Sequence, residues 1–337
     1  MNDYTDAPEI LQSYFAYKGA VQNRSKNTIF QYYHDLRSIF RYVVSKRNAQ
    51  KYKNVSLSDI PFSDITDNDV LTLTTKEIYE YLLFMHSKEL KGTSRARKLC
   101  CLRSLYKYLI KNGIISDDPT SHIESPKINK SLPKFLSLDE SVALLNNIDG
   151  NNKVRDFAIT TIFLNCGLRV SELCGINLSD INSDITTLHV TGKGNKERVV
   201  YLNEACTNAI KEYLKIRPKD VKFEDKNALF ISRNRNRISV KTVQWLVYKH
   251  LKNAQLENKH LSVHKLRHTA ATLMYTYGEA DVRVLKDVLG HENLATTEIY
   301  THVSDNQMKN AIDNNPLNQK QSGIHTPKAK IEIKKED

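Results

Sequence analysis

The segment from Ser125 to Phe135, which reads SPKINKSLPKF, most constrains how this chain of 337 residues folds. It holds two prolines and three lysines and shows no apolar periodicity. Because a residue before proline is pushed towards extended conformations, the segment predicts a linker between two domains. We expect a first domain over residues 1–124, the linker over 125–135, a second domain over 136–313 and a polar tail over 314–337.

The charge balance indicates the class of partner. The formal net charge is +12, which favours a polyanion, either nucleic acid or an anionic membrane surface. The first residues, MNDYTDAPEI, lack the basic and apolar regions of a signal peptide, and no run is long enough to span a bilayer. These observations leave nucleic acid as the expected partner and predict a cytoplasmic protein.

Cysteine and glycine patterns argue against metals and cofactors. The five cysteines have no C-x-x-C spacing, so disulfides and a thiolate zinc site are disfavoured and reduced, buried thiols are expected. The chain has no P-loop sequence, and the turn Gly192–Gly194 is too short to cradle a nucleotide phosphate. We expect no cofactor.

Apolar residues recur at helical spacing through residues 8–124, which predicts an all-helical first domain. The expected helices run from about Ile10 to Val21, from a cap at Ser25 through Val43, from a cap at Thr75 through Met85, and onward from Arg95. Residues 45–73 are expected to form a long polar connection with at most a short helical turn.

The start of that fourth helix carries an unusual set of polar residues. A charged face such as Lys98, Arg103 and Lys107 is ordinarily just solvated. Thr93, Ser94, Arg95 and Arg97 cluster at the helix start, and both helix N-termini and arginines bind phosphate oxygens. The cluster therefore favours contact with DNA phosphate.

The second half mixes helices and strands. We expect a helix with a capping box at Ser137 and Glu140, and a buried helix that ends at Gly167. Residues 187–191 and 197–202 predict a β-hairpin with Lys193 at its tip, residues 227–232 a third strand, and residues 240–254 a further helix. The expected fold class is mostly α with a small β-sheet.

His264 and Arg267 are the strongest candidate site residues. They lie three apart in a predicted helix over 262–277 with Ser262 as its cap, so their side chains meet over one turn. An imidazole beside a guanidinium is a poor core pair but a good phosphate pair. Arg169 and Glu172 are also three apart, where a structural salt bridge is the ordinary interpretation.

Four segments in order resemble the tyrosine recombinases of the phage-integrase type, and most of all their Xer-like branch. These are GLRVSEL (167–173), GKGNKERVVYL (192–202), HKLRHTAATLM (264–274) and LGHENLATTEIYTHV (289–303). SKNTIFQYYHDLRSIFRYV (25–43) and TSRARKLCCLRSLYKYL (93–109) resemble the family's helical core-binding domain. The resemblance implies that domain followed by an α+β catalytic domain.

The resemblance implies a role for each candidate. Tyr300 would attack the scissile phosphate to give a 3′-phosphotyrosyl link, with His264 as general base and Lys193 as the acid for the leaving oxygen. Arg169 and Arg267 would hold the non-bridging oxygens, with Glu172 orienting Arg169 and His291 adding a donor. The implied DNA contacts are Lys26, Asn27, Thr28, Thr93, Ser94, Arg95, Arg97 and Lys98. No metal is expected, because two guanidiniums supply the positive charge.

The implied partners are double-stranded DNA with paired half-sites, further copies of the chain in a tetramer on DNA, and a second recombinase or DNA translocase. The setting would be chromosome dimer resolution or integration and excision of a mobile element. Three alternatives stay open: a catalytically silent DNA-binding accessory protein, a type IB-like topoisomerase, and a zinc site. Zinc would be bound by His264, His268 and His291, but no glutamate stands where a zinc protease has one.

Overall fold

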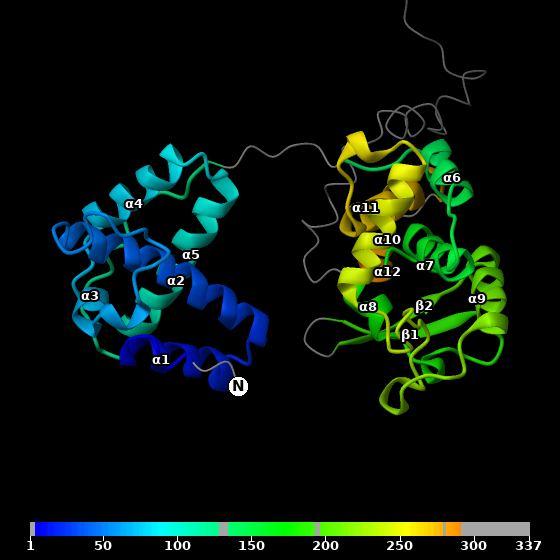
Figure 1. Cartoon of the computed structure of the whole chain (residues 1–337), viewed down its shortest axis with the longest axis horizontal. Helices are drawn as coiled ribbons and strands as arrows, with labels where there is room; N and C mark the ends of the chain where they lie inside the picture. The colour runs from blue at the N-terminus through cyan, green and yellow to red at the C-terminus, as the bar shows by residue number, and fades with distance from the viewer. Residues whose placement is uncertain (1–3, 128–133, 193–195, 279–280, 291–337) are drawn as a thin grey trace, which may run out of the picture. The chain divides into compact units, whose positions relative to one another are not determined.

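Two large hydrophobic cores divide the computed structural model into two units, Met1–Ser131 and Leu132–Asp337 (Figure 1). The structure describes residues 4–127, 134–192, 196–278 and 281–290. In this part of the chain no helix is both long and apolar enough to cross a bilayer. The expected fold class, mostly α with a small β-sheet, is confirmed.

All the regular elements described in the first unit are helical, as expected for residues 8–124. Its helices are α1 (Glu9–Ala16), α2 (Lys26–Arg47), α3 (Asp67–Leu71), α4 (Thr75–Ser87) and α5 (Gly92–Lys111), and a π-helical turn, Tyr17–Val21, extends α1. Helix α2 buries Leu36, Phe40 and Val43, and the predicted cap Ser25 accepts from the amide of Thr28 at 3.3 Å.

The sequence-based cap of α4 at Thr75 is wrong by one residue. Thr74 keeps the extended backbone that a cap requires, and its hydroxyl accepts from the amide of Glu77 at 3.2 Å. The hydroxyl of Thr75 instead donates to the carbonyl of Pro119 at 2.9 Å. The first of the two neighbouring threonines therefore caps the helix, and the second joins it to the loop after α5.

The connection over residues 45–73 is more than a polar linker. It contains the expected short helix, α3, and it buries Tyr52, Ile60, Phe62 and Ile65 in the core of the first unit. These apolar residues are scattered without a helical period, so the pattern does not reveal their burial. The segment is part of the domain's core.

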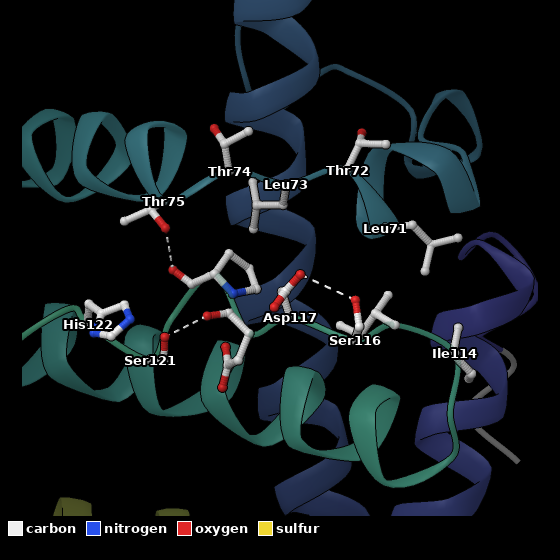
Figure 2. A pocket seen from close by; sticks show the side chains of 13 residues that line it. Leu71, Thr72, Leu73, Thr74, Thr75, Ile114, Ser116, Asp117, Ser121 and His122 are labelled. Carbon is white, nitrogen blue, oxygen red and sulfur yellow. Dashed lines mark hydrogen bonds between the residues drawn. The ribbon is translucent and has the colours of Figure 1, made fainter.

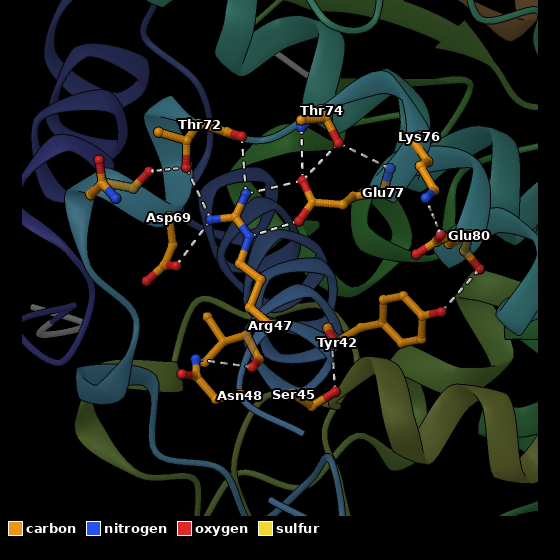
Figure 3. Close-up of polar contacts among 12 residues, drawn as sticks. Tyr42, Ser45, Arg47, Asn48, Asp69, Thr72, Thr74, Lys76, Glu77 and Glu80 are labelled. Carbon is orange, nitrogen blue, oxygen red and sulfur yellow. Dashed lines mark hydrogen bonds and ion pairs between the residues drawn. The ribbon is translucent and has the colours of Figure 1, made fainter. Parts of the chain in front are cut away.

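Arg47, the last residue of α2, joins three elements of the first unit (Figure 3). Its Nε and Nη2 donate to the two carboxylate oxygens of Glu77 at 2.7 and 3.0 Å. Its Nη1 donates to Asp69 at 3.1 Å and to the hydroxyl of Thr72 at 3.0 Å. Because Glu77 also accepts from the amide of Thr74, one guanidinium fixes the end of α2 against α3 and the start of α4.

Replacing Arg47 with methionine should destabilise the first unit by about 2 kcal/mol, because two carboxylates lose a charged donor. Burial alone would raise the pKa of Glu77, but hydrogen bonds from Arg47 and Thr74 hold that pKa below its usual value. The contribution of Arg47 is therefore present above the pKa of an unfolded glutamate and is lost as the pH falls through the lower folded pKa. Urea unfolding of the full-length chain at neutral and acid pH, with hydrogen exchange of α3 and α4, measures both effects.

Lys76→Met is the matched control, because the Lys76 side chain is 86% exposed and lies 4.0 Å from Glu80. An exposed pair of this kind contributes little to stability. Equal losses in the two variants, or a loss in R47M that does not change with pH, would contradict this account of Arg47.

The second unit packs its helices around α7. The helices are α6 (Leu138–Asn146), α7 (Lys153–Cys166), α8 (Val170–Gly175), α9 (Glu204–Ile216), α10 (Val240–Asn253), α11 (Val263–Tyr277) and α12 (Val282–Leu289), and the strands are β1 (Thr187–Thr191) and β2 (Glu197–Tyr201). Helix α7 contacts both α9 and α11 and buries residues on every side, which confirms the predicted buried helix (Figure 1). The predicted capping box of Ser137 and Glu140 is also confirmed.

The predicted β-hairpin is present, with β1 and β2 antiparallel. Leu188 and Val190 point into the core from β1, where Leu188 lies opposite Val200 and Val190 lies opposite Arg198. The amide of Gly192 donates to the carbonyl of Lys196 at 2.7 Å and so closes the base of the loop. The tip, with Lys193, lies outside the described residues.

The predicted third strand at residues 227–232 is wrong. The segment makes only isolated bridges, Asn177 with Ala228 and Ile231 with Arg237. Arg217 donates to the carbonyls of Ala228 at 2.7 Å and Leu229 at 3.2 Å, whereas the carbonyls of Asn227 and Phe230 accept from the amides of Leu178 and Ile238. A strand-like composition therefore folds into a loop whose backbone groups pair with the Arg217 side chain and with separate backbone segments, so no continuous ladder forms.

Candidate active site

The structure describes half of the residues predicted to be catalytic. Arg169, His264 and Arg267 lie within it, as does the supporting residue Glu172. Lys193, His291 and Tyr300 lie outside the described residues. The described part of the site therefore consists of arginines, a glutamate and the histidines of α11.

Arg169 and Glu172 form the contact that their spacing predicts. Arg169 stands at the N-cap of α8, and its Nη1 donates to Oε1 of Glu172 at 2.6 Å. Oε2 of the same carboxylate accepts from the backbone amide of Arg169 at 2.9 Å. Glu172 is buried, whereas the side chain of Arg169 is 32% exposed. The buried carboxylate thus orients a guanidinium that still reaches solvent.

Arg267 lies one helical turn after His264 in α11, and its side chain joins the C-terminal ends of α7 and α12. Its Nη1 donates to the carbonyl of Gly167 and its Nη2 to the carbonyl of Leu289, both at 2.7 Å. Gly167 is two residues before Arg169, so α11 is fixed against the turn that presents the other arginine. The side chain of Arg267 is buried.

The end of α12 is the point on which the arginines converge. Arg169 Nη2 donates to the carbonyl of Gly290 at 2.8 Å, next to the Leu289 carbonyl held by Arg267. A helix leaves its last carbonyls without intrahelical partners and carries partial negative charge at that end. Arg169, the N-cap of α8, and Arg267 of α11 therefore bind adjacent carbonyls, those of Gly290 and Leu289.

Two glycines allow this close approach. Gly167 and Gly290 end α7 and α12 with φ values of +59° and +65°, in the left-handed region that disfavours side chains. A Cβ on Gly167 would stand 2.7 Å from Cδ2 of Leu289. One on Gly290 would stand 3.2 Å from the side chain of Arg198. At the ends of α7 and α12, the backbone of each glycine therefore packs directly against a side chain, that of Leu289 or of Arg198.

Arg198 is a third arginine at this point, and the sequence reasoning missed it. Its Nη1 and Nη2 donate to the two oxygens of Glu172, each at 3.0 Å, and its Nε donates to the carbonyl of Val288 at 3.3 Å. Strand alternation could have pointed to Arg198, because Arg198 and the buried Val200 lie on the same face of β2. An arginine whose side chain points into the core needs a buried acceptor, because an unpaired buried charge is costly.

The histidines of α11 favour the neutral form. Desolvation lowers the pKa of His264, and the positive charges of Arg267, Lys265 and Arg169 add to that effect. Burial, followed by the influence of His264, lowers the pKa of His268 to about 4. The two rings meet edge to face with centroids 4.9 Å apart. A neutral His264 can accept a proton, as a general base must.

The predicted DNA contacts lie at the starts of α2 and α5. Lys26 and Asn27 are exposed in the first turn of α2, and Thr93 is exposed in the first turn of α5. Thr28, Ser94 and Arg95 are half-buried beside them. Arg97 and Lys98 both pair with the buried carboxylate of Asp35 on α2, so part of their charge is already compensated.

A cleft of about 720 Å³ lies elsewhere, in the first unit between the residues that precede α4 and the loop that follows α5 (Figure 2). Its walls carry hydroxyl groups and the carboxylates of Asp117 and Asp118, with no lysine or arginine. None of the predicted site residues lines it. Its charge suits neither a phosphate nor a DNA backbone, so it is not the candidate site.

Within the described part of the chain, no group of three or more histidine, cysteine, aspartate or glutamate side chains is placed to hold a metal ion. His291, which the zinc alternative requires, lies outside that part.

Two family models match the chain. The description "Phage integrase family" matches residues 134–307, and "Phage integrase, N-terminal SAM-like domain" matches residues 61–113. The first match spans all the described site residues and also His291 and Tyr300. The second spans α3, α4 and α5.

Individual proteins match as well. Tyrosine recombinase XerC of Caldanaerobacter subterraneus subsp. tengcongensis is 51% identical over 93% of this chain and 88% of its own length. XerH recombinase bound to its palindromic difH substrate has a TM-score of 0.64 at 20% identity, covering 93% of this chain and 98% of that one. A lambda integrase tetramer bound to a Holliday junction has a TM-score of 0.60 at 18% identity, covering 84% and 76%.

Gly167→Ala tests the close packing beneath the arginines. The added methyl should displace Leu289 in addition to the cost of about 1 kcal/mol for a left-handed alanine. We expect a lower thermal midpoint and faster hydrogen exchange in α12. Gly113→Ala is the control, because Gly113 has a φ of +67° and a methyl added there would meet nothing within 4 Å. If G167A and G113A destabilise the second and the first unit equally, tight packing at Gly167 is contradicted.

Proposed function

The chain belongs to the phage integrase family and is a tyrosine recombinase, and from this premise we propose which residues carry out strand exchange. The observation that supports the assignment most is the convergence of Arg169 and Arg267 on adjacent carbonyls at the end of α12. The family resemblance predicts both arginines and His264 at one site. Two arginines can bind the oxygens of one phosphate only if their guanidinium groups lie close together.

Cleavage begins with Tyr300. Its hydroxyl oxygen attacks the scissile phosphorus, the bond from phosphorus to the 5′ oxygen breaks, and a 3′-phosphotyrosyl link forms. His264 accepts the tyrosine proton, and Lys193 protonates the leaving 5′ oxygen. The covalent link conserves the phosphodiester energy. A 5′-hydroxyl from a second duplex then reverses the step, giving a Holliday junction without a cofactor.

The arginines stabilise the charge that builds on the phosphate. Arg169 and Arg267 bind its non-bridging oxygens, and His291 adds a further donor. Preorganised donors of this kind contribute roughly 10²–10³ in rate each. Arg169 is open to an incoming phosphate at 32% exposure, whereas Arg267 is buried, so we propose that Arg169 makes the first contact.

The two halves of the chain divide binding and chemistry. We propose that residues 1–124 form a core-binding domain, 125–135 the linker, 136–313 the catalytic domain and 314–337 the tail. The exposed starts of α2 and α5 support DNA contacts by Lys26, Asn27 and Thr93, with Thr28, Ser94 and Arg95 beside them. Arg97 and Lys98 contribute less charge than expected, because Asp35 pairs with both.

The working assembly is a tetramer on two duplexes with paired half-sites. Strand exchange joins two DNA molecules, and the lambda integrase of similar fold is a tetramer on a Holliday junction. The setting that we favour is chromosome dimer resolution in the cytoplasm, on the strength of the similarity to a XerC protein. A second recombinase or a DNA translocase is the partner that we propose for this setting.

Tyr300→Phe should keep DNA affinity and lose all covalent adduct, because only the nucleophilic oxygen is removed. The test is adduct formation on a nicked suicide duplex followed by denaturing electrophoresis. Tyr79→Phe is the control, since Tyr79 is an exposed tyrosine of α4 and should leave the adduct yield unchanged. A surviving adduct in Y300F would place the nucleophile elsewhere.

Cleavage and strand exchange should continue undiminished in EDTA, because guanidinium groups supply the charge that metal ions supply in many phosphoryl-transfer enzymes. The measurement is the single-turnover adduct rate before and after chelation. Activity that disappears with EDTA and returns with zinc or magnesium would rule out the proposed roles of Arg169 and Arg267.

A further inference from the structure

Arg198 joins three segments that are far apart in the sequence. It lies in β2, shortly after the hairpin loop that contains Lys193. Its two terminal nitrogens donate to both oxygens of Glu172 on α8, and its Nε donates to the carbonyl of Val288 near the end of α12. With its side chain only 15% exposed, Arg198 faces the protein interior.

The carboxylate of Glu172 depends on Arg198 as much as on Arg169. Arg198 binds it with two parallel hydrogen bonds of 3.0 Å, whereas Arg169 contributes one side-chain bond of 2.6 Å and one backbone bond of 2.9 Å. Two parallel bonds fix the plane of a carboxylate as well as its position. Because Glu172 is buried, removing one cation leaves part of its charge uncompensated at high cost.

The side chain of Arg198 also packs against the C-terminal end of α12. A Cβ on Gly290 would lie 3.2 Å from Cδ, Nε and Nη1 of Arg198, so Gly290 packs directly against this side chain. Arg169 and Arg267 hold the next two carbonyls, those of Gly290 and Leu289. Arg198 therefore acts on the α12 end both directly, through Val288, and indirectly, through Glu172 and Arg169.

We propose that Arg198 is a positioning residue for strand cleavage: it holds Glu172 in the orientation that aims Arg169, and it fixes the end of α12 that leads to His291 and Tyr300. This inference rests on the proposed function. Arg198 itself does not contact the phosphate. Its removal should slow chemistry while DNA affinity, which depends on other surfaces, stays nearly constant.

The first test compares Arg198→Met and Arg198→Lys in the full-length protein on a nicked suicide duplex. R198M should lower the single-turnover adduct rate by roughly 10–100-fold, the range for residues that support a catalytic group, with DNA affinity changed by less than about threefold. R198K should recover only part of the rate, because an ammonium cannot form the two parallel bonds. Arg217→Met is the control, since Arg217 also donates to backbone carbonyls, but to those of Ala228 and Leu229 and not to those at the end of α12.

A double-mutant cycle with Glu172→Gln separates positioning from general stability. Because Arg198 acts partly through Glu172 and partly through Val288, the double variant should be slower than E172Q alone, but by less than the two single losses multiplied together. The charged groups that face Glu172 are Arg169, at the N-cap of α8, and Arg198 from β2. Gly192 packs against Oε1 of Glu172. In R198M the acid limb of the rate should therefore move to higher pH, and this shift should be absent when Glu172 is glutamine.

Several outcomes would overturn the inference: an unchanged adduct rate in R198M, full rescue by lysine, additive losses in the cycle, or a rate loss in R217M as large as that in R198M. Failure of the proposed function gives a different result. In that case the wild-type chain forms no adduct, or Y300F forms as much adduct as the wild type. Either result contradicts the proposed function itself, whatever the Arg198 variants do.

Discussion

The carbonyl groups at the end of α12 need partners, and three arginines supply them. Val288, Leu289 and Gly290 accept from Arg198, Arg267 and Arg169 respectively. A helix end left without such partners inside a protein costs free energy for each orphaned carbonyl. The same donors are those that phosphate oxygens attract. One set of guanidiniums therefore stabilises the fold and prepares the site.

Glu172 makes this concentration of positive charge possible. Two of the three arginines share its buried carboxylate, so the cluster carries less net charge than its arginines alone would give. Hydrogen bonds from Arg198 and Arg169 hold the pKa of Glu172 below its usual value, although burial alone would raise it. The glutamate therefore stays ionised and keeps the arginines oriented across the neutral pH range.

Local patterns predicted much of this arrangement. Spacing of three residues correctly paired Arg169 with Glu172, and alternation and helical periods found the hairpin and the buried helix α7. Arg198 was missed because its partner stands 26 residues away and no local pattern connects them. The third strand was mispredicted for a similar reason, since its backbone groups are divided between the side chain of Arg217 and distant backbone segments. Long-range pairs of side chain and backbone leave little trace in a single sequence.

Hydrogen exchange of α12 in Glu172→Gln tests the central claim most directly. If the carboxylate orients the arginines that hold the end of this helix, residues 282–289 should exchange faster in E172Q than in the wild type. Helices α7 and α9, which do not depend on that contact, should keep their wild-type protection. Unchanged exchange in α12, or a uniform loss of protection across the second unit, would contradict the claim that Glu172 and its arginines hold this helix in place.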